Sequence, residues 1–523
     1  MTADSHHTID HIVAHNAATT PGAPAITFEG RTLSYRELDA RTSALADSLT
    51  QLGARKGDLV AFIGRNRPEH FEVIIAASKA GLIAVGLNWR LSQRELAEQL
   101  ADCSPFAVFT TSAARPTLAA ACTGLSPEAK IITFGEAGPL GHEGLVANGN
   151  AEPAPSRSSP DDLCMIWYTS GTTGRAKGVT FTHQSLWSIF PGAGAEWRIS
   201  HDSTSLVCMP TFHTAGVGWG LITLSFGGHI VIVDDFIPSE IVDLMMRLRV
   251  TNSVFAPIML EQVVADLERR GLPPLPDLRA ILYGASSITE PVLARVVEAL
   301  DCELIQGYGL TEVNGTISIL RSQEHTLTGE RRKYLRSAGV AVPWGELKVV
   351  DPETGTELPS GQVGEIWGKS PGMMTGYWNK PEESLEALTP DGWLRTGDAG
   401  YIDSEGFLFL TDRVKDMIIT GGENVYPIEI EHLIAAHPAV SEVAIVGVPD
   451  KKWGETIKAV VALKPGAHVT VQELIALTRA ELASYKCPTS VDFVDSLPRN
   501  ASGKILKRVI RDAYWTGHDR RIG

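Results

Sequence analysis

Residues 168–178 have the composition of a loop that binds phosphate oxygens. They read Tyr-Thr-Ser-Gly-Thr-Thr-Gly-Arg-Ala-Lys-Gly and follow an apolar segment. Glycines allow tight turns in which backbone N–H groups converge on anionic oxygens, while hydroxyls and a lysine add donors and charge. Ala176 precedes the lysine and no Ser or Thr follows it, so this is not a Walker A loop. We expect the polyphosphate contacts to be Thr169, Ser170, Gly171, Thr172, Thr173, Gly174 and Lys177.

A second run, residues 306–312, reads Gln-Gly-Tyr-Gly-Leu-Thr-Glu and combines an aromatic ring, a hydroxyl and a carboxylate. Tyr308 lies in a glycine-flanked turn, where its ring can stack on a base. Glu312 supplies a hard carboxylate oxygen of the kind that binds Mg²⁺, and Thr169 is the second expected metal contact. This run therefore has what a nucleotide needs next to its phosphates.

Three further runs add charged residues. Residues 393–398 end in Asp398, whose carboxylate can accept both hydroxyls of a ribose. Arg413 offers a planar fork for ribose or phosphate. Lys504 follows a Ser-Gly pair near the end of the chain. Taken alone, each of these charges would be a solvated side chain, and the order of the runs gives them their significance.

In this order, the five runs resemble the motifs of the adenylate-forming superfamily of acyl-CoA synthetases, peptide-synthetase adenylation domains and beetle luciferases. The motifs extend over residues 25–510. The resemblance implies that ATP and a carboxylic acid form an acyl-adenylate and pyrophosphate, and that the acyl group then passes to coenzyme A with release of AMP. It implies that Lys504 bridges the attacking carboxylate and the α-phosphate. The acid is itself the nucleophile, so positioning and charge neutralisation should supply most of the catalysis.

The resemblance also assigns roles to residues between these runs. Thr311 is expected to bond the phosphate region, and Gly284 and Ala285 would let the backbone approach the base. Lys415 matches the hinge about which the C-terminal domain of the family rotates, so that residues 421–424 enter and line a pantetheine tunnel. The other nucleotide and coenzyme A contacts that it implies are Gln306, Gly307, Gly309, Gly421, Gly422 and Glu423.

Residues 210–216, Pro-Thr-Phe-His-Thr-Ala-Gly, bear on the branch of the superfamily. Peptide-synthetase adenylation domains usually carry Asp after this Phe to pair with the substrate ammonium, so His213 argues against an α-amino acid. The lack of a carrier domain after residue 523 points the same way. In acyl-CoA synthetases a His is common here and gates or lines the acyl pocket, whereas a buried structural His is the alternative. The candidates for the acyl pocket are Phe212, Val217, Trp219, Ser286, Val313, Asn314 and Gly315.

These candidates are mainly small or apolar, with no fixed charge to bind a second polar group. A medium- to long-chain fatty acid is therefore the expected substrate, and an aryl or alicyclic acid is the alternative. A luciferase-like monooxygenase shares every motif and would be separated by substrate assay. A non-catalytic adenylate-binding protein would be expected to lack Lys504 or Glu312, and both are present.

Composition excludes other classes of function. The 46 Lys and Arg residues against 61 Asp and Glu give a formal net charge of −15, which repels nucleic acid backbones and anionic lipids. The six cysteines lack metal-ligand spacing and indicate a reduced, cytoplasmic protein. Residues 1–15 lack a signal-peptide pattern, and glycines divide the apolar stretch 215–233 into core segments rather than a membrane span. A homodimer is compatible with the sequence, because many relatives form one.

The elements that must position these residues indicate an α/β fold. From residue 58 to 320, apolar runs at 163–167, 229–233, 280–283 and 303–305 read as strands, with helices at 239–249 and 290–300 between them. This alternation predicts parallel sheets covered by helices. Residues 345–411 are rich in Gly, Pro and strands and predict a small β-rich subdomain. The predicted domains are 1–411, a hinge at 412–415, and a small mobile α+β domain at 416–523.

Overall fold

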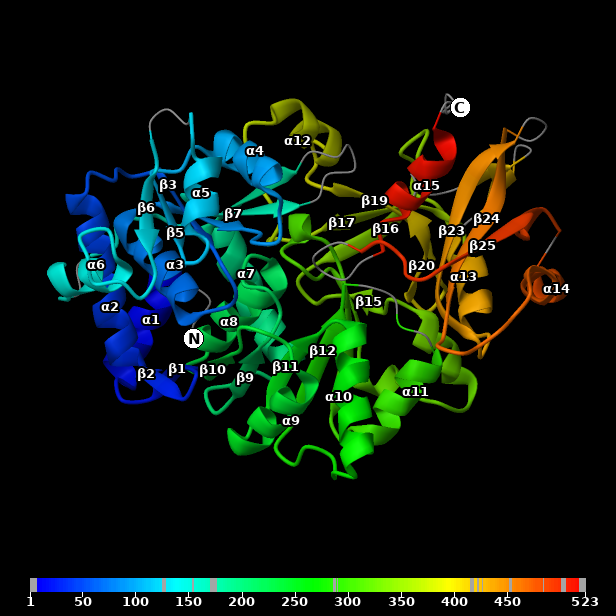
Figure 1. Cartoon of the computed structure of the whole chain (residues 1–523), viewed down its shortest axis with the longest axis horizontal. Helices are drawn as coiled ribbons and strands as arrows, with labels where there is room; N and C mark the ends of the chain where they lie inside the picture. The colour runs from blue at the N-terminus through cyan, green and yellow to red at the C-terminus, as the bar shows by residue number, and fades with distance from the viewer. Residues whose placement is uncertain are drawn as a thin grey trace.

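The computed structural model describes residues 7–124, 128–152, 155–169, 176–285, 288, 290–413, 418–420, 423–425, 427–450, 454–482, 484–499 and 505–516. At 412, 413, 419, 423, 424, 454 and 485 it describes the backbone only. Within these residues the chain forms four sheets with helices packed against them (Figure 1). The predicted α/β class, with a small β-rich part and a C-terminal α+β part, is confirmed.

The largest sheet has nine strands in the order β15-β14-β13-β12-β11-β9-β10-β1-β2. The strands from β13 to β1 run parallel, and β2, β14 and β15 pair antiparallel. The carboxyl ends of the parallel strands therefore lie at one edge. The bounds are β1 (Pro24–Phe28), β2 (Arg31–Ser34), β9 (Thr204–Val207), β10 (His229–Ile232), β11 (Asn252–Phe255), β12 (Ala280–Gly284), β13 (Glu303–Tyr308), β14 (Ser318–Leu320) and β15 (Val340–Ala341).

A second sheet has seven strands in the order β18-β8-β7-β4-β3-β5-β6. Every residue of β3 and β4 is buried, as expected of parallel strands covered on both faces. The antiparallel strand β8 follows β7, so the two strands flank the phosphate-loop residues. The bounds are β3 (Leu59–Ile63), β4 (Ile83–Leu87), β5 (Ala107–Thr110), β6 (Lys130–Thr133), β7 (Leu163–Thr169), β8 (Lys177–Thr182) and β18 (Gly376–Tyr377).

Helices cover both sheets, and local sequence signals set several of their ends. Ser34 and Glu37 form the capping box that begins α2, and Gly81 ends α3 in the left-handed conformation. Described helices of this part are α1 (Ile9–Thr19), α2 (Tyr35–Gln51), α3 (Pro68–Ala80), α4 (Gln93–Cys103), α5 (Arg115–Ala121), α6 (His142–Asn148), α7 (His183–Glu196), α8 (Thr214–Ser225), α9 (Pro238–Arg247), α10 (Pro257–Arg270) and α11 (Glu290–Ala299). Short 3₁₀ turns are η1 (Thr311–Val313), η2 (Ser322–Glu324) and η3 (Glu330–Arg336).

The apolar stretch 215–233 forms a buried helix and a strand, as the glycines predict. Helix α8 packs against α7 and against β9 and β10 of the nine-stranded sheet. Among the residues that the structure describes, none of the helices has the length and apolarity that crossing a membrane requires.

The β-rich part is an antiparallel sheet in the order β16-β17-β19-β20. Its bounds are β16 (Glu346–Val350), β17 (Gly364–Lys369), β19 (Leu394–Ile402) and β20 (Leu408–Arg413), with α12 (Pro381–Ala387) beside it. Strand β20 extends past the predicted domain boundary at residue 411, so the first two hinge positions are part of this sheet. The division of the chain into three segments otherwise stays a prediction.

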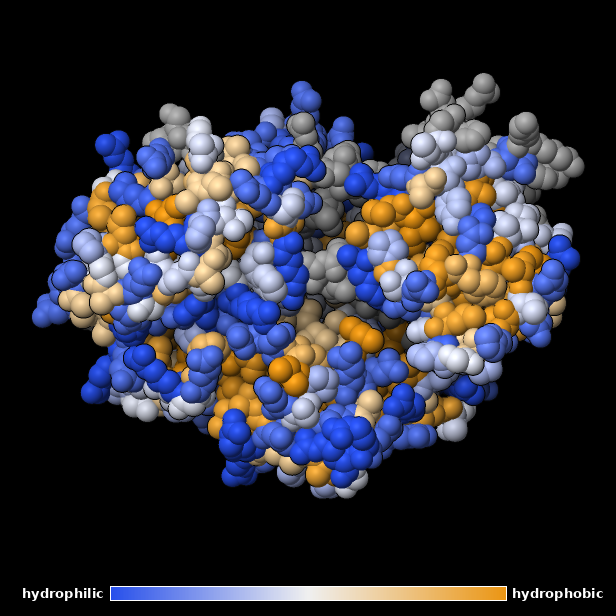
Figure 2. All heavy atoms as spheres, in the orientation of Figure 1, coloured by the Kyte–Doolittle hydropathy of each residue, from blue (hydrophilic) through white to orange (hydrophobic). Residues whose placement is uncertain are grey.

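The C-terminal part has its own sheet, in which β24 pairs with β23, β21 and β25 (Figure 1). A separate apolar cluster forms its core, as expected of a small independent unit. Its elements are β21 (Ile418–Thr420), β22 (Glu423–Val425), α13 (Pro427–Ala435), β23 (Val440–Asp450), β24 (Gly454–Leu463), α14 (Val471–Glu481), η4 (Ser484–Lys486), β25 (Ser490–Val494) and α15 (Lys507–Trp515). Figure 2 shows hydrophilic and hydrophobic residues mixed over the face seen in Figure 1, with hydrophobic residues most concentrated over the C-terminal part.

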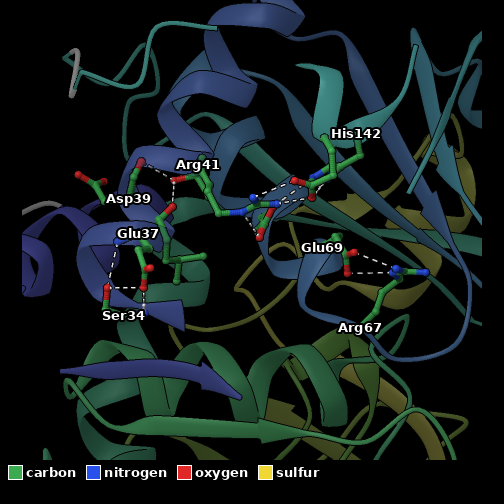
Figure 3. A network of polar contacts seen from close by, with 11 residues as sticks. Ser34, Glu37, Asp39, Arg41, Arg67, Glu69 and His142 are labelled. Atoms are coloured by element: carbon green, nitrogen blue, oxygen red, sulfur yellow. Dashed lines mark hydrogen bonds and ion pairs between the residues drawn. The ribbon is translucent and has the colours of Figure 1, made fainter. Parts of the chain in front are cut away.

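A buried ionic network holds α2, α3 and α6 together (Figure 3). Arg41 donates from Nε to Oε1 of Glu72 at 2.8 Å and from Nη2 to Oε1 of Glu143 at 2.6 Å. Nε2 of His142 lies 3.1 Å from Oε2 of Glu72, and both side chains are almost fully buried. Burial alone would lower the pKa of His142, but hydrogen bonds to Glu143 and Glu72 outweigh it and raise the pKa to about 9.

We expect this network to make stability depend on pH. The folded-state pKa of His142 lies above the value of about 6.5 in an unfolded chain, so its contribution is fully present below pH 6.5 and is lost as pH rises through 9. The thermal midpoint of the wild type should exceed that of His142→Gln most at pH 6, and this difference should shrink as the pH rises toward 10. Exposed His201 provides the control, since His201→Gln should match the wild type throughout. A difference between wild type and His142→Gln that is constant with pH would contradict this.

Candidate active site

A cavity of about 540 Å³ lies at the carboxyl edge of the nine-stranded sheet. Residues at the ends of β11, β12 and β13 line it, as expected for a ligand site in an open parallel sheet. The other walls come from β7 and β8, from α7 and α8, from β18 and α12, and from β17 and β19. The cavity is therefore assembled where three of the four sheets meet.

The backbones of β12 and β13 approach closely at the edge of the cavity. A Cβ atom on Gly284 would lie 2.2 Å from the carbonyl oxygen of Gly307, so no larger residue fits there. Ala285 follows in the left-handed region with a φ of 68°, which turns the chain out of the sheet. Gly284 and Ala285, which the sequence predicts to approach the base, and Gly307 and Gly309, predicted as cofactor contacts, all line the cavity.

Tyr308 and Asp398 come from different sheets and contact each other directly. The phenol O–H donates to Oδ2 of Asp398 at 2.8 Å. The Asp398 backbone N–H donates to Oγ1 of Thr396, which holds this end of β19. Arg413 lies opposite Asp398 in the pairing of β19 with β20. The structure thus brings together three of the predicted nucleotide residues, although Tyr308 and Asp398 lie beside the cavity rather than in its wall.

The polar wall of the cavity contains a chain of four contacting residues. Oε1 of Glu312 accepts a hydrogen bond from the phenol of Tyr377 at 2.9 Å. The ammonium of Lys177 lies 4.7 Å from the centre of the Tyr377 ring and pairs with Oε2 of Glu383 at 2.8 Å. All four residues line the cavity. The carboxylate predicted to bind a metal and the lysine predicted to bind phosphate therefore share one aromatic neighbour.

Local sequence explains how these side chains are placed. Pro381 stands in the first turn of α12, where its missing N–H leaves no donor unpaired. Glu383 follows in the same turn, where the positive end of the helix favours a carboxylate. The Met374 backbone N–H donates to the Glu312 carbonyl at 2.9 Å, which ties the segment before β18 to η1.

Another part of the cavity wall is apolar and comes from α7, α8 and the ends of β9 and β11. Trp197 and Trp219 stack with ring centroids 5.5 Å apart. The wall consists of Ile189, Phe190, Trp197, Met209, His213, Thr214, Ala215, Gly218, Trp219, Ile222, Val254 and Phe255. Burial, with a smaller effect of the Arg90 charge, lowers the pKa of His213 to about 4, so the imidazole is neutral at pH 7. This wall is thus uncharged among the described residues.

The structure places three predicted acyl-pocket residues in the core instead. Phe212, Val217 and Val313 are at most 3% exposed and do not line the cavity. The cavity face of α8 carries Ala215, Gly218, Trp219 and Ile222, and Val217 points to the opposite side of the helix because of the 3.6-residue period. The predicted Trp219, Asn314 and Gly315 do line the cavity, as do Thr169, Thr311 and Glu312. Gln306 lies in β13 outside its wall.

Some predicted residues lie outside the described part of the chain, and for others the structure describes only the backbone. The former are Ser170, Gly171, Thr172, Thr173, Gly174, Ser286, Lys415, Gly421, Gly422 and Lys504. The latter are Arg413 and Glu423.

Tyr377, Glu383 and Gly218 line the cavity although the sequence did not predict them as site residues. Tyr377 lies in the two-residue strand β18 and Glu383 in the short helix α12, and neither element is long enough to show a period that points to a site. Gly218 had a signal that could have been used, since it stands four residues before Ile222 and three after Ala215 in a helix.

Comparison with known proteins shows what the chain is similar to. Residues 13–378 match the AMP-binding enzyme family, and residues 429–504 match the AMP-binding enzyme C-terminal domain. The chain is 35% identical to the fatty acid–[acyl-carrier-protein] ligase ScoC of Streptomyces coeruleorubidus over 98% of both chains. It is 36% identical to a feruloyl-CoA synthase of an Amycolatopsis species over 95% of this chain and 97% of the other. The crystal structure of ATP-bound MatB from Rhodopseudomonas palustris superposes with a TM-score of 0.87, at 32% identity, over 97% of this chain and 99% of MatB.

The ion pair of Lys177 gives a prediction about nucleotide binding. A phosphate that binds Lys177 must compete with Glu383, so Glu383→Gln should lower the KM for ATP. A partly exposed pair contributes about 0.2–1 kcal/mol, which corresponds to a fall of up to about fivefold. Initial rates at varied ATP concentration measure this. The matched control is Glu386→Gln, which removes the same charge one turn later on α12 and should leave the KM for ATP unchanged. An unchanged or raised KM in Glu383→Gln would show that Glu383 does not compete.

Proposed function

The chain belongs to the AMP-binding enzyme family, and on this basis we propose that it joins an apolar carboxylic acid to coenzyme A through an acyl-adenylate. It is an AMP-forming acid–thiol ligase, and the proposal concerns its acid, its thiol and the roles of its residues. One observation carries the proposal. A single cavity has a polar wall that contains Lys177 and Glu312 and an uncharged wall that contains Trp197 and Trp219, so both substrates of an adenylation can meet in it.

The polar wall has the features that ATP and Mg²⁺ require. Gly284 and Gly307 both line the cavity, and in our proposal their exposed backbone lies beside the base. In our proposal Tyr308 stacks on the base and Asp398 binds the ribose, and the contact between these two side chains supports this. A Mg²⁺ ion bound to the phosphates would neutralise their charge, and Glu312 and Thr169 offer it oxygen ligands in the cavity.

In the first step, a carboxylate oxygen of the acid attacks the α-phosphorus of ATP. The bond between this phosphorus and the bridging oxygen breaks, and pyrophosphate leaves. In our proposal Lys504 neutralises the charge that develops on the α-phosphate, and Lys177 holds the departing phosphates. Because His213 is uncharged, it does not attract the substrate carboxylate away from the α-phosphorus of ATP.

In the second step, the sulfur of coenzyme A attacks the acyl carbon, and the bond to the AMP oxygen breaks. We propose that the C-terminal domain rotates about Lys415, so that residues 421–424 replace Lys504 beside the adenylate. The relative ScoC is named for an acyl-carrier-protein substrate, and the feruloyl-CoA synthase for coenzyme A. We propose coenzyme A as the acceptor of the acyl group. The thiol of a carrier protein is the alternative acceptor to be assayed.

The uncharged wall supports an acid without a second polar group. Its described residues include no Lys, Arg, Asp or Glu, so nothing there would pair with the second carboxylate of a diacid. We propose a medium- to long-chain fatty acid as the first candidate. An aryl or alicyclic acid is the second candidate, because Phe190, Trp197, Trp219 and Phe255 give the wall aromatic faces on which a ring can pack. We further propose a cytoplasmic enzyme in lipid metabolism, and a homodimer.

A panel of acids tests the proposed reaction. We expect release of AMP and pyrophosphate that depends on both an acid and coenzyme A, with straight-chain acids of graded length and ring-bearing acids in parallel arms. Dicarboxylic acids of matched length should react at least about tenfold more slowly, because the uncharged wall would leave a charge unpaired. Formation of ADP in place of AMP would contradict adenylation, and transfer only to a carrier protein would contradict the choice of coenzyme A.

Replacement of Lys504 separates the two steps. Lys504→Ala should slow adenylation by about 100-fold or more, because it removes a positive charge that acts on the transition state. Transfer from a supplied acyl-adenylate to coenzyme A should stay close to the wild-type rate. Lys507→Ala, which changes a nearby lysine of α15, serves as the matched control and should leave adenylation near the wild-type rate. Equal loss of both steps in Lys504→Ala would contradict its assigned role.

A further inference from the structure

Helix α8 contains three glycines within five residues, Gly216, Gly218 and Gly220. Glycine is unfavourable in a helix interior, because it loses more backbone freedom on folding than other residues do. The presence of each of these three glycines in a buried helix therefore requires a structural explanation.

Packing explains two of these glycines. A Cβ atom on Gly216 would lie 2.3 Å from the carbonyl oxygen of Pro210, which is backbone and cannot move aside. A Cβ atom on Gly220 would lie 2.5 Å from Cε1 of the fully buried Phe71. At both positions the helix must approach a neighbour too closely for any side chain.

Packing does not explain Gly218. A Cβ atom there would meet no heavy atom within 4 Å, and the residue lines the cavity. Gly218 lies on the helix face that carries Ala215 and Ile222, which belong to the uncharged wall. The space that a side chain would occupy is therefore part of the cavity itself.

We infer that Gly218 sets the width of the acyl part of the cavity, so that ring-bearing acids are accepted beside straight-chain acids. The stacked rings of Trp197 and Trp219 belong to the same wall, and aromatic surfaces pack favourably against a substrate ring. A side chain at position 218 would occupy part of this space, which should exclude a ring before it excludes an alkyl chain. The inference rests on the proposed function and assigns to Gly218 a role in specificity rather than in catalysis.

The test compares Gly218→Ala and Gly218→Leu with the wild type. Pyrophosphate release with octanoic acid and with cinnamic acid gives kcat/KM for a straight-chain and a ring-bearing substrate. In Gly218→Ala, kcat/KM for cinnamic acid should fall by about tenfold or more, while that for octanoic acid should change by less than about threefold. Gly218→Leu should show a larger fall for cinnamic acid. The thermal midpoint of Gly218→Ala should equal or exceed that of the wild type, because alanine favours the helix and meets no neighbour.

Gly220→Ala is the matched control on the same helix. It should lower the thermal midpoint through its clash with Phe71, without a selective loss of either acid. The inference is overturned if the wild type accepts octanoic acid but not cinnamic acid, or if Gly218→Ala affects both acids equally. It is also overturned if Gly218→Ala lowers the thermal midpoint as Gly220→Ala does. If none of the acids supports pyrophosphate release by the wild type, the proposed function is contradicted, and the inference about Gly218, which rests on it, is contradicted as well.

Discussion

The site depends on the tight turn that follows strand β13. A Cβ atom on Gly309 would lie 2.3 Å from the carbonyl oxygen of Gly315, so the segment between them closes on itself without room for a side chain. Tyr308 leaves this turn toward Asp398, and Glu312 leaves it toward Tyr377. The partners belong to the β-rich sheet and to β18 of the seven-stranded sheet. One backbone constraint on the nine-stranded sheet thus fixes the positions of side chains that meet two other sheets.

The lining of the cavity contains two groups of residues with different chemistry. The charged residues come from β8, η1, β17, β19 and α12, whereas the uncharged wall comes from helices and strands packed in the main core. A charge in that wall would require a buried partner, because desolvation of an unpaired charge is costly. His213 illustrates this point, since burial lowers its pKa and leaves the ring neutral where α8 begins. The division between the two walls is therefore maintained by burial as well as by residue type.

The sequence predicted those features that depend on local pattern. The apolar strands at 280–283 and 303–305 and the helix at 290–300 are present with ends that differ by at most three residues, because alternation of apolar runs with helical patterns specifies a parallel sheet. Long-range pairing was harder to predict. The contact between Tyr308 and Asp398 joins residues 90 positions apart, and no local pattern encodes it. The side of α8 that meets the cavity was also not predictable, because this helix is apolar all round, and the candidate Val217 lies in the core.

Tyr377 shows how a residue without a local signal can organise charged neighbours. Its ring presents two surfaces of different character, an edge that carries the hydroxyl and an electron-rich face. The hydroxyl donates to Glu312, and the face receives the ammonium of Lys177. Burial, reinforced by the Glu312 charge, raises the pKa of Tyr377, so the phenol keeps its proton and remains a donor. Because the ring is rigid, it fixes the separation between a carboxylate suited to a metal and a lysine suited to phosphate. A flexible side chain of similar size could contact both groups, but it would not hold them at one distance.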